Sequence, residues 1–408
     1  MNNKTILIIG IITICKLHAV SQVGSSPYSF FGQGQIKNSV LGINHGLGGS
    51  GIALSSENGL NSLNPASYQG LKKEQFIFEI AFSGKHTQFV TQNNRNSEFD
   101  ANLSNIALGF RINNWWSASA GIQQYSNINY EIDSKGFLPG EESEFDIKYT
   151  GEGAINQFYF AHSFNIHNFS IGIKPSVLWG NAKYSEYADI EDLELYTIDE
   201  EYTLINTYID YGVQYQIPFK NSLLTLGATL GNENTLRTNS NIRLYNQLDS
   251  TSYEIDERSF LIPLSYGFGM SYKLKNNWLF ISDFEFRKWK DKTYNSDILT
   301  TRNSYRYSAG IEFSPSYKPR DIYFKKIKYR IGGFYKENYL IVEETPINTY
   351  ALTFGLGMPL KRNASRINIS GEIGVNGTTK NNLLKEEYFL FHINISLQDR
   401  WFQKSKYN

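Results

Sequence analysis

The residues that could perform chemistry are few and scattered along the chain. Beyond residue 21 the histidines are His45, His86, His162, His167 and His392, and no two of them have the spacing of metal ligands. A serine hydrolase that uses His162 or His392 remains an alternative, because such catalytic pairs meet in space and not in sequence. Isolated histidines explain the pattern more simply. We therefore expect no catalytic residue, no metal and no cofactor.

Gly46, Gly48 and Gly51 spell G-x-G-x-x-G, which binds dinucleotides when it follows a strand and opens a helix. Here no strand precedes the glycines, and no acidic residue follows at the required distance. Ser50 lies in no nucleophile-elbow pattern either. Compaction of the backbone is the simpler explanation of these glycines.

Charge excludes a nucleic-acid partner. Lys plus Arg and Asp plus Glu are both 39, so the chain has no basic footprint for phosphates. The segment 184–202 carries eight acidic residues, which we interpret as a solvated outer loop. Binding of Ca²⁺, or of divalent cations that bridge to lipopolysaccharide, is the alternative, although the spacing fits no EF-hand.

The composition indicates a β-rich protein. Only 19% of the 408 residues are charged, 15% are aromatic, and 33 are glycines, at a mean hydropathy of -0.38. This is too polar on average for a bundle of membrane helices and poor in charge for a soluble enzyme. An all-β protein, in which apolar residues alternate with polar ones, fits both facts.

Apolar and small residues alternate with period 2 in segment after segment, which is the signature of strands. Phe260, Ile262, Leu264, Tyr266 and Phe268 show it most clearly, with Gly267 and Gly269 in the other register. We expect about fourteen strands, at 75–90, 102–112, 115–130, 155–166, 169–180, 204–217, 222–231, 260–274, 277–288, 303–314, 325–338, 347–360, 366–376 and 386–398.

These strands are predicted to close into a transmembrane antiparallel β-barrel. The connections alternate between long and short, as in outer-membrane barrels, with only 314–324 longer than the other short ones. An even strand number places both termini in the periplasm. The register opposite the apolar one is mostly Gly, Ser, Ala and Asn, which suits a crowded lumen better than water. The six tryptophans lie near strand ends, as an interfacial girdle requires: Trp115, Trp116, Trp179, Trp278, Trp289 and Trp401.

Residues 1–21 resemble a secretory signal peptide, with Lys4 before an apolar run that is too short to span a bilayer. Cys15 would mark a lipoprotein, but Ile14 stands where a small residue is required. Removal of this segment takes away the only cysteine, so no disulfide is expected. We expect a chain exported to the outer membrane of a Gram-negative bacterium.

Residues 22–71 are Gly-rich and do not alternate, whereas 72–408 form the predicted barrel. The segment 22–71 is too apolar for a disordered tail, and fourteen strands enclose more space than their own side chains fill. A plug, or hatch, inside the lumen satisfies both facts. Its apolar candidates for ligand contact are Phe30, Phe31, Leu41, Leu47, Ile52 and Leu54.

The run 41–66, with Gly46, Gly48 and Gly51 followed by Asn64, Pro65 and Ala66, resembles the hatch of the long-chain fatty acid transporter family, which includes FadL, OmpP1 and TodX. The resemblance implies a fourteen-stranded barrel plugged by this hatch. It also implies that the Asn-Pro-Ala element lies where the hatch meets a kinked third strand, through which an apolar ligand leaves sideways. Gly121, Gln123 and Gln124 are the candidates for that lateral opening.

The predicted function is therefore the uptake of hydrophobic compounds such as long-chain fatty acids, by diffusion through a monomeric barrel gated by its hatch. Arg111, Lys174 and Arg306 are candidates for contacting a ligand carboxylate, as are Lys328 and Arg330. Ion pairing with Glu79, Asp283, Glu285 or Glu372 is their alternative role. Membrane lipids and lipopolysaccharide are the expected surroundings.

Two other functions remain open. In the first, the chain would be an accessory barrel subunit of an outer-membrane secretion or assembly complex, with an outer-membrane protein as partner. In the second it would be a general diffusion porin, which the apolar plug argues against.

Overall fold

The computed structural model describes residues 26–31, 33–37, 40–137, 144–189, 196–245, 250–275, 277–289, 299–315, 321–360 and 365–400. The predicted signal peptide with Cys15 lies outside these residues, as does Trp401. Within them, no helix is long and apolar enough to cross a membrane.

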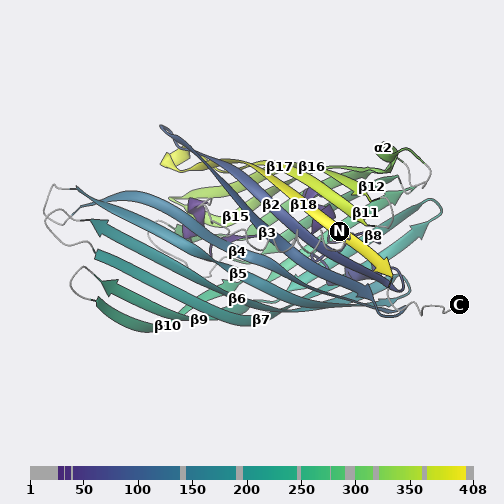
Figure 1. Cartoon of the computed structure of the whole chain (residues 1–408), viewed down its shortest axis with the longest axis horizontal. Helices are drawn as coiled ribbons and strands as arrows, with labels where there is room; N and C mark the ends of the chain where they lie inside the picture. Colours follow the sequence, from purple (N-terminus) through teal and green to yellow (C-terminus); the bar gives the residue numbers. More distant parts are fainter. Residues whose placement is uncertain are drawn as a thin grey trace, which may run out of the picture.

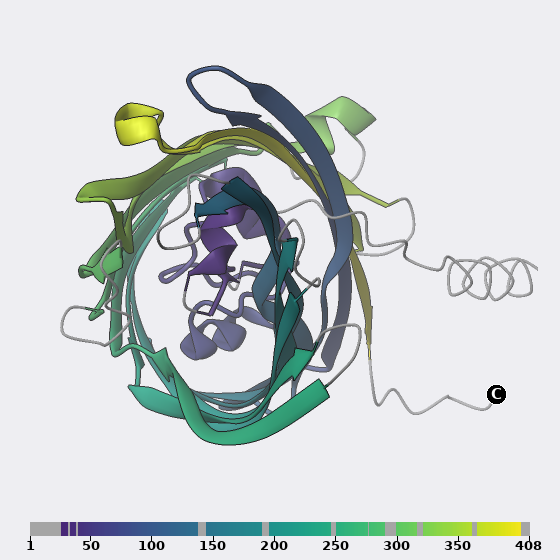
Figure 2. The ribbon, with the colours of Figure 1, turned by 90° about the vertical axis from the view of Figure 1, so that its left-hand side faces the viewer.

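Fourteen strands form one closed antiparallel barrel, as the alternation predicts (Figures 1 and 2). Pairing of β18 with β2 closes the sheet. Three of the fourteen strands are interrupted and carry two labels each. The bounds are β2 Gln75–Val90, β3 Arg95–Arg111, β4 Trp116–Phe137, β5 Glu144–Ile166, β6 Phe169–Asp189, β7 Tyr196–Phe219, β8 Ser222–Gly231 with β9 Asn234–Tyr245, β10 Ser250–Ile262 with β11 Ser265–Leu274, β12 Trp278–Arg287, β13 Leu299–Thr301 with β14 Ser304–Phe313, β15 Lys328–Val342, β16 Thr345–Pro359, β17 Arg366–Gly377 and β18 Lys385–Arg400.

The outer face of the barrel is apolar and the inner face is small or polar. On β11, Tyr266, Phe268 and Met270 point outwards and are 39%, 56% and 50% exposed. Gly267 and Ser271, in the other register, point inwards and are buried. An outward apolar band is what a lipid bilayer requires of a spanning sheet.

The strands extend further than alternation predicts. The expected connection 131–154 belongs to β4 and β5 except for 138–143, which lie outside the described residues. The expected connections 181–203 and 232–259 are likewise mostly strand, because backbone hydrogen bonds continue the ladder where both faces are polar and the alternation fades.

The prediction of a solvated loop at 184–202 is therefore wrong for most of that segment. Tyr184–Asp189 end β6 and Tyr196–Tyr202 begin β7, while 190–195 lie outside the described residues. Asp199 is buried, accepts a hydrogen bond of 2.6 Å from the Ser185 hydroxyl, and pairs with the Lys183 ammonium at 3.1 Å. Its charge is used within the sheet.

The described residues of the N-terminal segment 26–71 lie inside the barrel (Figure 2, purple). It contains three short 3-10 helices, η1 Pro27–Phe30, η2 Gly42–Leu47 and η3 Pro65–Gly70, and the two-residue strand β1 Gln35–Ile36. We call this segment the hatch. Two further short helices, α2 Tyr323–Lys326 and η4 Lys380–Asn382, lie in connections between strands.

Glycines of the wall allow the hatch to approach the sheet closely. A Cβ atom on Gly310 of β14 would lie 2.7 Å from the Leu47 Cα atom. Gly172 of β6 and Gly212 of β7 face Pro65 and Asn64 in the same way. The inward glycines that the sequence placed in the lumen are thus seats for the hatch backbone.

Trp115, Trp116 and Trp278 mark one end of the outer face, whereas Trp179 lies in the middle of β6 and not near a strand end as predicted. Trp115, Trp116 and Phe164 stack near one another, and Trp278 lies 4.4 Å from Phe313 between ring centroids. Trp289 is only 1% exposed and stacks on Tyr339 at 4.2 Å inside the lumen. Its assignment to the girdle is wrong because the chain turns inwards after β12, so the indole completes an interior cluster.

Candidate functional site

The Asn-Pro-Ala element fixes the hatch to the wall. The Asn64 side chain caps η3 by accepting a hydrogen bond of 2.9 Å from the Ala66 N–H, and its amide donates to the Ile52 carbonyl at 2.7 Å and the Val213 carbonyl at 3.1 Å. Ser163 of β5 donates to the Ala66 carbonyl at 3.0 Å. These contacts are with β5 and β7.

Carboxylates of the wall hold the hatch backbone. Asp283 of β12 accepts hydrogen bonds from the N–H groups of Gly51 and Ile52, at 2.6 and 2.9 Å. Glu79 of β2 accepts one from the Leu60 N–H at 2.9 Å. Each bond joins a backbone N–H group of the hatch to a buried carboxyl oxygen, so this part of the hatch is attached to opposite sides of the barrel.

The wall itself is interrupted between β3 and β4. Their ladder runs only from Asn105–Gln123 to Arg111–Ser117, although both strands continue beyond it. A bulge at Ser104 in β3 and another at Tyr125 in β4 lie at the point where the ladder stops. Figures 1 and 2 show the β2–β3 hairpin diverging from β4 there. We call this interruption the β3–β4 gap.

The hatch occupies the inner side of β4 beside the gap. Gln35 and Ile36 of β1 pair with Asn127 and Ser126, and the Lys37 N–H donates to the Tyr125 carbonyl at 2.9 Å. The residues predicted to form the lateral opening lie in β4 at or near the β3–β4 gap. Gln123 forms the last pair of the ladder, Gln124 precedes the bulge, and Gly121 lies within the ladder.

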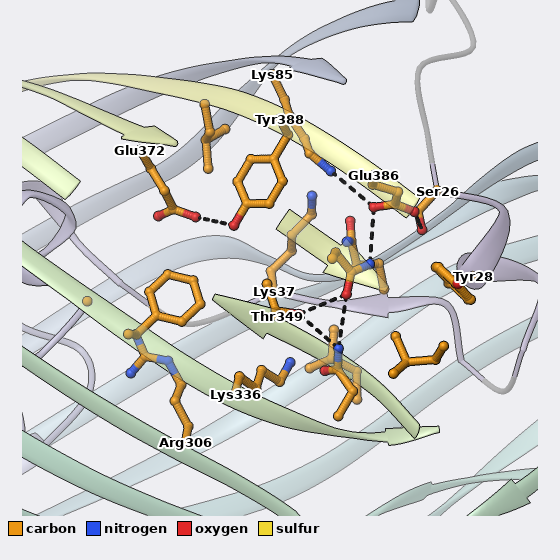
Figure 3. A pocket seen from close by; sticks show the side chains of 18 of the residues that line it. Ser26, Tyr28, Lys37, Lys85, Arg306, Lys336, Thr349, Glu372, Glu386 and Tyr388 are labelled. Atoms are coloured by element: carbon orange, nitrogen blue, oxygen red, sulfur yellow. Dashed lines mark hydrogen bonds and ion pairs between the residues drawn. The ribbon is translucent and has the colours of Figure 1, made fainter. Parts of the chain in front are cut away.

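A cavity of about 230 Å³ lies between the hatch and the wall (Figure 3). Its walls come from the hatch near Lys37 and His45, from β2 and β3, and from β14 to β18. Apolar side chains cover part of it, among them Val40, Phe334, Leu340, Ile347 and Leu390. The cavity therefore presents both apolar and charged surface to a bound molecule.

Cations outnumber anions around the cavity. Five basic side chains face three acidic ones: Lys37, Lys85, Arg287, Arg306 and Lys336 against Asp100, Glu372 and Glu386. Several form ion pairs: Lys85 lies 3.9 Å from Glu386, and Arg306 lies 2.8 Å from Glu285, which does not itself line the cavity. Lys37 and Lys336 have no ion-pair partner among the residues that the structure describes.

Lys37 belongs to the hatch and not to a membrane-spanning strand. Burial, and secondly the neighbouring Lys85 ammonium, lowers the pKa of Lys37 to about 8. An anion bound in the cavity would relieve both effects, because it would compensate the buried positive charge.

The basic residues that were predicted to contact a ligand carboxylate lie in different places. Arg306 lines the cavity, where its guanidinium lies 4.8 Å from the Phe334 ring and donates to the Gly48 carbonyl. Lys174 pairs with Asp210 at 2.9 Å, and Arg111 donates to the Leu71 carbonyl at 2.8 Å where the hatch ends. Lys328 and Arg330 both pair with Glu312, at 2.6 and 2.7 Å.

The predicted apolar contacts mostly pack the hatch. Leu41, Leu47, Ile52 and Leu54 are buried against the wall or the rest of the hatch, and none of them lines the cavity. The Phe30 ring lies 5.3 Å from the Tyr130 ring between centroids, and Phe31 packs against the cluster that contains Trp289 and Tyr339.

Sequence reasoning missed Lys37 and Lys336. Lys336 lies on the same inward register of β15 as Lys328 and Arg330, so the strand pattern contained the signal. Lys37 is the only Lys or Arg between residues 22 and 71, a signal that was equally available. That both line one cavity could not be read from the sequence, since it depends on how the hatch folds.

Fold and site together define a plugged β-barrel of the outer-membrane type. The BamG family model matches residues 1–408, so the chain belongs to the BamG family. No curated protein sequence matches the chain significantly.

Solved structures with this fold include three transporters or their relatives. The toluene transporter TbuX of Ralstonia pickettii is 14% identical, with a TM-score of 0.59 over 88% of this chain and 98% of its own. A FadL homologue of Pseudomonas aeruginosa is 12% identical, with a TM-score of 0.59 over 90% and 99%. The toluene transporter TodX of Pseudomonas putida is 12% identical, with a TM-score of 0.60 over 90% and 100%. The barrel therefore has the FadL-like fold that the hatch motif indicated.

Proposed function

We propose that this protein takes up hydrophobic molecules with an anionic head, such as long-chain fatty acids, across the outer membrane. The end with long strands faces outwards, and both termini and the short turns face the periplasm. The ligand binds in the cavity with its carboxylate among the basic side chains that line it, which include Lys37, Lys336 and Arg306, and with its chain against the apolar lining.

The observation that carries this proposal is that two lysines of the cavity, Lys37 and Lys336, form no ion pair with any residue that the structure describes. Lys37 approaches from the hatch and Lys336 from β15, beside apolar side chains that an acyl chain could cover. Five basic side chains line the cavity against three acidic ones, and positive charge that is partly removed from water is stabilised by an anion, so the cavity favours an anionic ligand over a neutral hydrocarbon such as toluene. The folds of TbuX and TodX thus support transport, while the charges of this cavity select another ligand.

We further propose that the ligand leaves through the β3–β4 gap. The cavity is lined by Lys85, Asp100 and Asn102 of β2 and β3 and by β1, so it reaches the strands that border the gap. The hatch between Gly51 and Ala66 is hydrogen-bonded to the wall, so passage straight through the hatch would require breaking those hydrogen bonds. Sideways exit requires only that β1 leave β4.

Binding can be tested by native mass spectrometry and by titration with a long-chain fatty acid and with the alcohol of equal length. Lys37→Met and Lys336→Met should each weaken fatty-acid binding by about tenfold, or ~1.4 kcal/mol, and leave alcohol binding unchanged. Lys73→Met removes an exposed lysine elsewhere and serves as the control. Equal loss for both ligands would contradict a carboxylate site.

Exit can be tested by deleting Tyr125, the extra residue of the β4 bulge. The deletion should allow β4 to pair further with β3, so that uptake by cells falls while binding to the purified protein persists. Tyr125→Ala keeps the bulge and controls for loss of the side chain. Normal uptake with Tyr125 deleted would exclude this exit.

A second candidate function, an accessory subunit of an outer-membrane complex, is favoured by a groove of about 1030 Å³ on the lipid-facing side. Ser282, Ala309 and Gly333 adjoin one another across β12, β14 and β15 and form its floor. Small residues allow a second transmembrane protein to approach closely. Ala309→Trp should abolish stoichiometric co-purification of a partner in mild detergent and leave fatty-acid binding intact. Fatty-acid binding with no partner in the unaltered protein would favour the transporter alone.

A further inference from the structure

The connection between β14 and β15 differs from the other turns at its end of the barrel. It comprises fourteen residues, 314–327, of which 316–320 lie outside the described residues. The other connections at this end, between β3 and β4, β5 and β6, β7 and β8, β11 and β12, and β16 and β17, span two to six residues. Because a hairpin needs no more than that, the extra length serves something other than chain reversal.

The described part of this connection exposes large apolar side chains. Helix α2 spans Tyr323–Lys326, and Ile322, Tyr323 and Phe324 are 65%, 43% and 71% exposed. Lys325, next to them, is also exposed. Such a group is costly in water, since burying an apolar side chain of this size is worth about 1.5–3 kcal/mol.

The helix is attached to the lipid-facing side of the barrel. Figure 2 shows α2 in light green outside the ring of strands, and Figure 1 places it at the end that carries the short turns. The hydroxyl of Tyr329, which points outwards from β15, donates to the Phe324 carbonyl at 3.1 Å. Trp278 and Phe313 lie on the outer face at the same end of the neighbouring strands β12 and β14. The apolar patch therefore continues the aromatic girdle beyond the last residues of the wall.

We propose that Ile322, Tyr323 and Phe324 insert into the headgroup region of the adjacent membrane leaflet, with Lys325 on the phosphates of anionic phospholipids. Aromatic and aliphatic side chains next to a lysine are typical of interfacial anchors. Continuity with the girdle distinguishes a lipid surface from a protein partner, because the patch begins where the lipid-facing band ends. The anchor would hold the β14–β15 side of the barrel at a set depth.

The exported protein can test this, since the only cysteine of the sequence, Cys15, lies in the predicted signal peptide, so an introduced cysteine accepts a single label. Phe324→Cys, labelled with a polarity-sensitive fluorophore, should emit at shorter wavelength in vesicles that contain phosphatidylglycerol. Phospholipids with a spin label near the headgroup should quench this emission at least twofold. Lys220→Cys, in the exposed β7–β8 turn at the same end, is the matched control and should be quenched little.

A second variant tests the charge. Lys325→Glu in the Phe324→Cys protein should reduce quenching in anionic vesicles and have little effect in vesicles of phosphatidylcholine alone. Equal quenching at positions 324 and 220 would overturn the proposal and favour a water-exposed patch for a periplasmic protein. These labels report position only, so the outcome is independent of whether the barrel transports fatty acids.

Discussion

The half of the lumen next to the short turns, here called the inner half, and the half next to the long strands, called the outer half, are filled in different ways. In the inner half, the hatch backbone lies directly on wall glycines such as Gly310 and is held by Asp283 and Glu79. In the outer half, apolar side chains from β4 to β10 and from β12 to β16 form two separate clusters, and Ile36 of β1 packs against both. Backbone contact leaves no room for the hatch to slide, whereas side-chain clusters separated by a cavity leave some room. We therefore expect the hatch to be fixed at one end and adjustable at the other.

The largest effect should come from adding a side chain to a wall glycine that contacts the hatch backbone. Gly310→Val should destabilise the protein by about 3 kcal/mol, because its Cβ would meet the Leu47 backbone at 2.7 Å. Urea unfolding in detergent would measure the change. Ala309→Val, whose side chain faces lipid one residue away, is the matched control. If both variants unfold alike, the inner half is not closely packed.

Removing a wall carboxylate should have a smaller effect. Asp283→Ala leaves the N–H groups of Gly51 and Ile52 without their acceptor, at a cost of about 2 kcal/mol. Amide hydrogen exchange at these two residues should accelerate. Asp283→Asn keeps an oxygen acceptor and should restore most of the protection; if it behaves like Asp283→Ala, steric effects and not hydrogen bonding explain the loss.

The two halves should also differ in the unaltered protein. The Lys37 N–H, bonded to Tyr125 beside the gap, should exchange with deuterium at least tenfold faster than the Gly51 N–H. Site-resolved exchange by mass spectrometry or NMR would show the ratio. Slower exchange at Lys37 than at Gly51 would reverse the assignment of fixed and adjustable ends.

The smallest effect is a pH dependence of ligand binding. With a pKa of about 8, Lys37 is mostly charged at pH 7 and mostly neutral at pH 9. Fatty-acid affinity should therefore fall several-fold between these values, since the ammonium that attracts the carboxylate is lost as pH rises. Lys37→Met should flatten the profile, and an unchanged slope in that variant would assign the effect to another group.

The sequence was sufficient to predict the barrel. Period-2 alternation records which side of a strand meets lipid, so it located fourteen strands and the lipid-facing residues of β11, and β2 was predicted residue for residue. The alternation failed where β4 to β10 leave the lipid, because water allows polar residues on both faces. It also failed at Trp289, whose place inside the lumen depends on the path of the chain after β12.

Only the tertiary structure decided what the inward residues do. Composition alone does not distinguish Arg306, which reaches the cavity, from Arg330, which pairs with Glu312, because both occupy the inward register of a strand. The position of the hatch against the wall decides which of them reaches the cavity. The same position makes Lys37 and Lys336 line one cavity, although about 300 residues separate them. A strand pattern is local and states which way a side chain points, whereas a site in the lumen depends on contacts that only the closed and filled barrel creates.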